Sequence, residues 1–109
     1  MTAYDEVIKE IGGDTFEGIV FAFRNIDYEG KHCYVPERLC NRVLVDLEVI
    51  KHYMDKWSYN GGYGGEECPP TTIWTDKRVI FVCCYDGSTW LQSVPRNPTN
   101  HNPSFCGGG

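Results

Sequence analysis

The fold is decided by residues 71–95, which read TTIWT, DK, RVIFVCCY, DG and STWLQSVP in succession. Three runs rich in β-branched and aromatic residues are separated by two breaks of two residues each. Asp86-Gly87 is typical of a type I′ hairpin turn, because both central residues of that turn need a positive φ. If Asp76-Lys77 is a second two-residue turn, the stretch forms an antiparallel meander of three strands.

Two-residue turns also set the register of such a meander. Directly opposed residues share a face, and successive residues alternate between faces. The predicted pairs are Tyr85 with Ser88, Cys83 with Trp90, Phe81 with Gln92, Val79 with Val94, Trp74 with Val79, and Ile73 with Ile80. One face, here named the aromatic face, carries Trp74, Val79, Phe81, Cys83, Tyr85, Trp90 and Val94. The other, the aliphatic face, carries Ile73, Ile80, Val82, Cys84 and Leu91. Because both faces are apolar, both are expected to be covered.

The rest of the chain predicts an α+β fold, with a mainly antiparallel sheet of about five strands and two helices. Residues 2–11 have helical spacing of apolar residues, with Thr2 as N-cap and glycine at the end. Residues 15–25 and 31–35 have strand patterns, and the first of these strands is expected to be central. Residues 37–45 fit either a helix or a strand. Residues 46–57 predict a longer helix packed on the aliphatic face.

Composition limits the class of protein. The chain has 109 residues and a formal net charge of −5, which predicts one α+β domain over residues 1–98 and an extended, flexible tail over 99–109. An acidic chain is not expected to bind nucleic acid broadly. No apolar run reaches membrane-spanning length and no signal peptide opens the chain, so a cytoplasmic protein without a membrane anchor is expected. The six cysteines are therefore expected to be reduced, and their spacing does not favour a metal site or a cofactor.

A cluster of cations is the candidate ligand site. The register brings Lys77, Arg78 and Arg96 to one end of the sheet, with Asn97 next to them. Guanidinium groups suit bidentate contacts to phosphate, and aromatic rings suit stacking on a base. The alternative is that neighbouring carboxylates, Asp76 among them, simply neutralise the cluster.

Aromatic residues and one more arginine extend this candidate site. They are Trp74 and Trp90 of the aromatic face, Tyr59 and Tyr63 of the glycine-rich loop over residues 58–70, and Arg24 at the end of the first strand. The long loop fits either a lid over the site or a solvated connection.

The segments Tyr85–Thr89 and Ser93–Pro98 resemble small phage-encoded accessory proteins. Among these, the anti-defence sponges that sequester nucleotide second messengers are the nearest functional counterpart. The resemblance implies a non-enzymatic, symmetric α+β protein that binds a small charged nucleotide, such as a cyclic nucleotide, between subunits.

Three functional classes follow from these observations. The first is a non-enzymatic binding protein that sequesters a small anionic, nucleotide-like ligand at the cation cluster. The alternative is an acidic protein-interaction module that inhibits a host protein complex, because tyrosine and tryptophan are favoured at interfaces. An enzyme is not expected, since no catalytic residues are indicated. A homo-oligomer is expected, because the short N-terminal helix cannot cover a whole sheet face.

Overall fold

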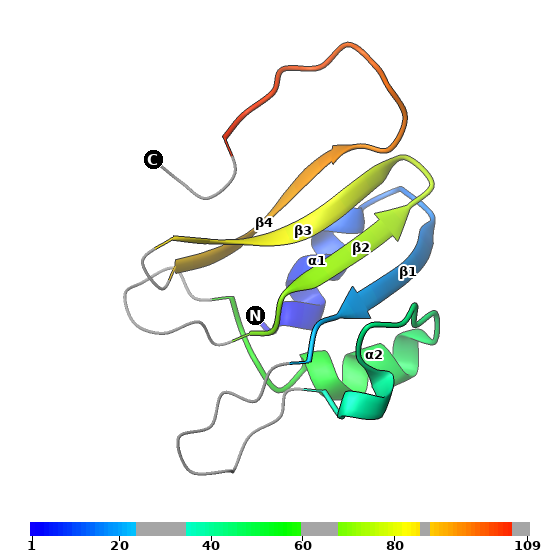
Figure 1. Ribbon diagram of the computed structural model, residues 1–109, viewed down its shortest axis with the longest axis vertical. Coiled ribbons are helices and arrows are strands. Elements are labelled where there is room, and N and C mark those ends of the chain that lie inside the picture. Colours follow the sequence, from blue (N-terminus) through cyan, green and yellow to red (C-terminus); the bar gives the residue numbers. More distant parts are fainter. Residues whose placement is uncertain (24–34, 60–67, 86–87, 106–109) are drawn as a thin grey trace.

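A computed structural model describes residues 1–23, 35–59, 68–85 and 88–105. The chain forms an α+β fold with one four-stranded antiparallel sheet in the order β1-β2-β3-β4 (Figure 1). The elements are α1 (Ala3–Ile11), β1 (Phe16–Phe21), the 3₁₀ helix η1 (Glu37–Leu39), α2 (Leu47–Met54), β2 (Thr71–Thr75), β3 (Arg78–Tyr85) and β4 (Ser88–Pro95). The predicted class is therefore confirmed.

The meander β2-β3-β4 has the predicted register at every pair. Tyr85 lies opposite Ser88 and Cys83 opposite Trp90, and the remaining four predicted pairs are also found. The β3–β4 ladder continues past the strands, because the Arg96 N–H donates to the Lys77 carbonyl at 3.0 Å. The hairpin turn Asp86-Gly87 itself lies outside the described residues.

The prediction of about five strands is one strand too many for the described part of the chain. The strand predicted at residues 31–35 lies outside the described residues except for Val35, which is a buried bend. The strand predicted at residues 15–25 is β1, and it ends at Phe21.

β1 lies at one end of the sheet order and not at its centre, so that expectation was wrong. Residue Leu44 forms an isolated bridge along its outer side, donating to and accepting from Ile19 at 2.8 and 3.0 Å. This bridge follows η1, so the ambiguous segment 37–45 is neither a full helix nor a full strand. Its contact with the backbone of β1 is made through Leu44, whereas Val43 and Val45 on either side are exposed.

Both helices begin at predicted caps. Thr2 and Asp5 form a reciprocal capping box at α1, and Gly12 ends that helix with a φ of 56°. The Asp46 carboxylate accepts the N–H groups of Glu48 and Val49 at the start of α2. α2 ends at Met54, three residues before the predicted end. Trp57 nevertheless reaches the core, where its ring meets that of Phe21 at 5.9 Å.

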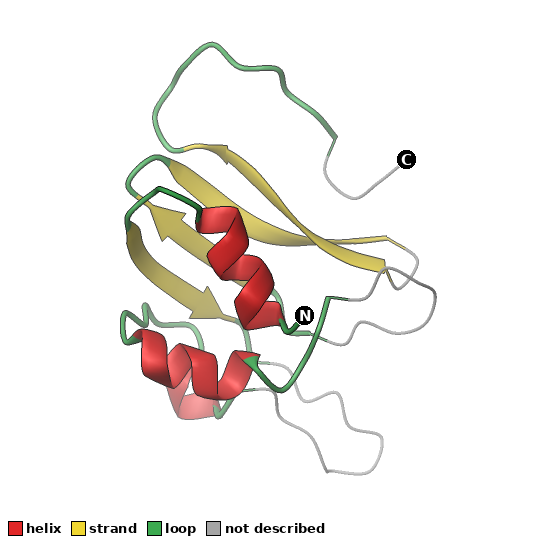
Figure 2. Ribbon diagram, turned by 180° about the vertical axis from the view of Figure 1, so that it is seen from behind, coloured by secondary structure: helices red, strands yellow, loops and turns green. Residues whose placement is uncertain are grey.

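The core lies between the helices and the aliphatic face. Figure 2 shows both helices on the same side of the sheet, with α1 crossing it. The buried residues of α1 are Ala3, Val7 and Ile11, and those of α2 are Ile50 and Met54. They join Ile19, Ile73 and Ile80 in one hydrophobic cluster.

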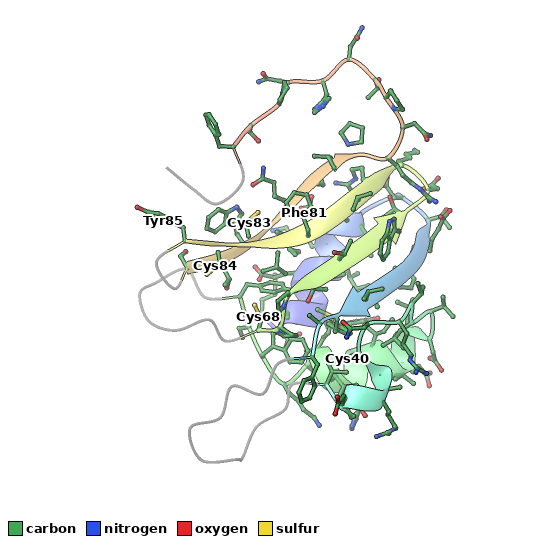
Figure 3. The ribbon with its side chains drawn as sticks, viewed as in Figure 1. Cys40, Cys68, Phe81, Cys83, Cys84 and Tyr85 are labelled. Atoms are coloured by element: carbon green, nitrogen blue, oxygen red, sulfur yellow. The ribbon has the colours of Figure 1, made fainter. Side chains whose placement is uncertain are left out.

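The aromatic face has no helix over it in the described part of the chain (Figure 1). That this face is covered stays a prediction, because most of the 58–70 loop and the end of the tail lie outside the described residues. Figure 3 shows Phe81, Cys83 and Tyr85 in succession along β3. The exposed fraction is 59% for Tyr85 and 40% for Val94, whereas Cys83 between its neighbours is buried. Phe81 is half-buried. This side of the sheet is therefore partly accessible and mostly apolar, with Gln92 opposite Phe81 as a polar member that holds Ser104 and Phe105 of the tail.

Candidate functional site

Arg78 of the predicted cation cluster binds to the C-terminal end of α1. Its Nε donates to Asp14 Oδ2 at 2.8 Å and its Nη1 to Glu10 Oε1 at 3.0 Å. Its Nη2 donates to the backbone carbonyls of Glu10 and Ile11. Cations favour the C-terminal end of a helix, where carbonyls lack intrahelical partners. Arg78 therefore joins β3 to α1, and its guanidinium is occupied.

Asp14 forms an ion pair with Arg78, and the Thr75 hydroxyl is hydrogen-bonded to both residues. The hydrogen bond from Arg78 lowers the pKa of Asp14 below its usual 3.8, and a hydrogen bond from Thr75 also lowers it. The Thr75 hydroxyl donates to Asp14 Oδ2 at 3.0 Å and accepts the N–H groups of Lys77 and Arg78 at 3.1 and 2.9 Å. A buried threonine thus fixes the β2–β3 turn and its salt bridge together.

Arg96 is engaged as well. Its Nη1 donates to the Thr75 carbonyl at 2.8 Å and forms an ion pair with Glu17. Asp76 forms no ion pair among the described residues, and its Oδ1 accepts the Thr15 N–H at 2.8 Å. Among the described residues, Lys77 has no ion pair. The geometry thus agrees with the alternative that carboxylates neutralise the cluster, although Glu10, Asp14 and Glu17 serve in place of Asp76.

A shallow pocket of about 370 Å³ remains at the base of the tail. Arg96 and Asn97 of the predicted site line it, together with Val94, Pro95, Pro98, Thr99 and His101. The tail then forms an open arch beside β4 (Figure 1) and is held by Gln92, whose Nε2 donates to Ser104 Oγ at 3.1 Å. Within the predicted anion site, this pocket is the place where Arg96 and Asn97 both line an accessible cavity.

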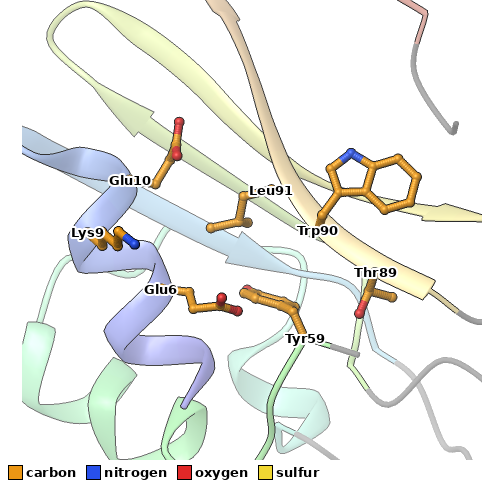
Figure 4. Close-up of a pocket in the computed structure, with 7 residues that line it drawn as sticks. All are labelled: Glu6, Lys9, Glu10, Tyr59, Thr89, Trp90 and Leu91. Carbon is orange, nitrogen blue, oxygen red and sulfur yellow. The ribbon is translucent and has the colours of Figure 1, made fainter. Parts of the chain in front are cut away.

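The predicted aromatic residues do not gather in one place. Trp74 and Trp90 stand half-buried on the aromatic face, on β2 and β4. Tyr59 lies on the other side of β4, against α1 (Figure 4). Tyr63 and Arg24 lie outside the described residues.

A larger pocket of about 450 Å³ opens between α1 and β4, and the sequence did not predict it as a site. Its lining residues are Glu6, Lys9, Glu10, Tyr59, Thr89, Trp90 and Leu91 (Figure 4). The helical spacing of Glu6 and Glu10 places them on one side of α1. That spacing was the available signal, but only the fold shows that this side of α1 faces β4.

Tyr59 gives this pocket an unusual polar group. Burial raises the pKa of its phenol well above the usual 10.0, and the charge of Glu6 raises it further. The hydroxyl is shielded from water and has no hydrogen-bond partner in the described structure. Buried hydroxyls are usually paired, so this one is a group whose hydrogen-bonding capacity is unused.

Metal chemistry has no candidate in the described part of the chain, where no three histidine, cysteine or acidic side chains are grouped as metal ligands. Cys40, Cys68 and Cys83 are buried as thiols. None of the described helices has the length and apolar character needed to cross a bilayer. Comparisons of the chain with protein-family models, curated proteins and solved structures find no match.

Proposed function

We propose that this chain is a non-enzymatic protein-interaction module that binds its partner through the aromatic face. The observation that carries this proposal is the accessible, uncharged surface on the side of the sheet opposite α1 and α2. Tyr85 and Val94 are its most exposed apolar members, and exposed apolar patches on monomeric proteins often have a binding role. Aromatic residues are also the commonest energetic centres of interfaces.

The charges of the chain support the same class of function. Two of its predicted anion-binding cations, Arg78 and Arg96, are held by carboxylates. An anionic ligand could use all the donors of either guanidinium only by displacing the carboxylate that is already paired with it. The net charge of −5 instead favours encounter with a basic partner.

Two matched valine variants test the proposal. Val94 lies on the aromatic face and is 40% exposed, whereas Val49 lies on α2 and is 37% exposed. Immobilised wild-type protein and the Val49→Glu variant should retain the same proteins from a host lysate. Val94→Glu should lose them, because a buried unpaired carboxylate disfavours the contact. Equal retention by the two variants would show that the aromatic face is not the interface.

A second candidate function is sequestration of a small anionic, nucleotide-like ligand, as in a phage anti-defence sponge. The specific observation in its favour is the 370 Å³ pocket at the tail base, where Arg96, Asn97 and His101 are lining residues. The Nη1 atom of Arg96 is engaged by Glu17 and Thr75. An anion in this pocket would therefore have the Nε and Nη2 groups of Arg96 to bind.

Calorimetry decides on this second candidate. Mono-, di- and cyclic nucleotides are titrated into wild type, Arg96→Ala and Arg38→Ala, the last being an exposed arginine on η1 far along the chain. Sequestration predicts heat with wild type and Arg38→Ala, and at least a tenfold weaker association with Arg96→Ala. The absence of heat with every nucleotide would eliminate a nucleotide ligand.

A further inference from the structure

The outer side of β4 is an edge of the sheet with backbone groups available for pairing. β4 ends the strand order, and β3 is the only strand that borders it among the described residues. In an antiparallel ladder, alternate residues direct their N–H and C=O groups toward and away from the neighbouring strand. The Arg96–Lys77 hydrogen bond continues the series of pairs that includes Val94 with Val79, so these residues point inward. Leu91 and Ser93 therefore point their backbone groups outward.

The tail does not satisfy these outward groups. Its described contact with the middle of β4 is made by the side chain of Gln92, which donates to Ser104 and to the Phe105 carbonyl. Among the described residues, no backbone hydrogen bond runs from the arch to Leu91 or Ser93. Exposed strand edges of this kind are templates for pairing with another chain.

The 450 Å³ pocket lies directly below this edge. Leu91 belongs to both features, because its side chain points from β4 toward α1 while its backbone points outward (Figure 4). An added strand would place alternate side chains on the same face as Leu91. Those side chains would enter the pocket, whereas the others would lie beside Trp90 and extend the aromatic face.

The polar groups of the pocket select a cationic side chain. Glu10 already pairs with Arg78, which leaves Glu6 as the carboxylate without an ion pair among the described residues. Glu6 lies beside the Tyr59 hydroxyl, which also has no partner (Figure 4). Lys9 at the rim is exposed to solvent. A lysine ammonium or an arginine guanidinium can pair with this carboxylate.

We propose that the β4 edge binds an extended segment of another protein by strand addition, with a lysine or arginine of that segment in the pocket against Glu6. This inference rests on the proposed function as a protein-interaction module and names the mode and charge of the partner segment. Strand addition draws affinity from main-chain hydrogen bonds and specificity from alternate side-chain pockets.

Peptides of defined pattern test this inference. The probe is a capped octapeptide of alternating lysine and valine, compared with its glutamate–valine counterpart and with a version N-methylated at every second backbone amide. The lysine peptide should bind saturably and shift the NMR amide signals of Leu91 and Ser93. The glutamate peptide and the N-methylated peptide should each bind at least tenfold more weakly.

Protein variants separate the pocket from general charge attraction. Glu6→Gln should weaken binding of the lysine peptide about tenfold, whereas Glu48→Gln, an exposed acid on α2, should change it less than twofold. Equal effects of the two variants, equal binding of the N-methylated peptide, or no saturable binding would overturn the inference. Because the assay needs no partner captured through the aromatic face, its failure would leave the valine comparison intact. Failure of the valine comparison would likewise leave the peptide result intact.

Discussion

At the scale of single residues, Thr75 connects more of the structure than its size suggests. Its side chain is fully buried, and its hydroxyl donates to Asp14 while accepting the N–H groups of Lys77 and Arg78. Replacement of the hydroxyl by a methyl group keeps the volume but removes three hydrogen bonds, those to Asp14 and from the part-buried N–H groups of Lys77 and Arg78. The stability lost on this replacement is therefore determined by hydrogen bonding and not by packing.

We predict that Thr75→Val lowers the free energy of unfolding by about 2–3 kcal/mol, because three hydrogen bonds are lost at about 1 kcal/mol each. Thr71→Val is the matched control, because Thr71 is buried in the same strand and its hydroxyl makes one bond, to the Pro69 carbonyl at 2.9 Å. Its cost should be about 1 kcal/mol. Urea unfolding followed by tryptophan fluorescence measures both. Similar losses for the two variants would mean that the network around Thr75 adds nothing.

At the scale of elements, turn lengths, strand periodicity and helix caps predicted those features that depend on residues close together in the sequence. The meander needed only turn lengths and strand periodicity, so its register could be derived residue by residue. The caps of α1 and α2 follow from Thr2 and Asp46 for the same reason. The position of β1 could not be derived, because it pairs with a strand about fifty residues away and no local signal specifies that partner.

In the candidate sites too, features set by neighbouring residues were predicted and those set by residues distant in the sequence were not. Turn lengths place Lys77, Arg78 and Arg96 at one end of the sheet, but the acids that pair with the two arginines come from α1, the segment after it and β1. No spacing in the sequence places Asp14 or Glu10 beside Arg78. The α1–β4 pocket depends on how a helix crosses a sheet, so it is visible only in the fold.

At the scale of the whole molecule, the aromatic face is suited to a second copy of the chain. A two-fold interface brings the same patch of each subunit together. Its members Trp74, Val79, Phe81, Cys83, Tyr85, Trp90 and Val94 include no charged residue. The face can therefore meet itself without like-charge repulsion, even though each copy has a net charge of −5. The remaining repulsion between copies is screened by salt.

We predict that the purified protein, without its partner, sediments as a homodimer joined by the aromatic faces, that the partner displaces the second copy, and that added salt strengthens the self-association. Trp90→Glu should give monomers or insoluble protein, because it sets a carboxylate on each side of the contact. The less invasive Val94→Glu should give monomers that still unfold cooperatively, and Val49→Glu should remain dimeric. A dimer joined by its aromatic faces leaves both β4 edges outside the contact, so each copy could still bind a basic segment. Sedimentation of wild type as a compact monomer at high concentration would refute the dimer, and the aromatic face would then be left for a different protein.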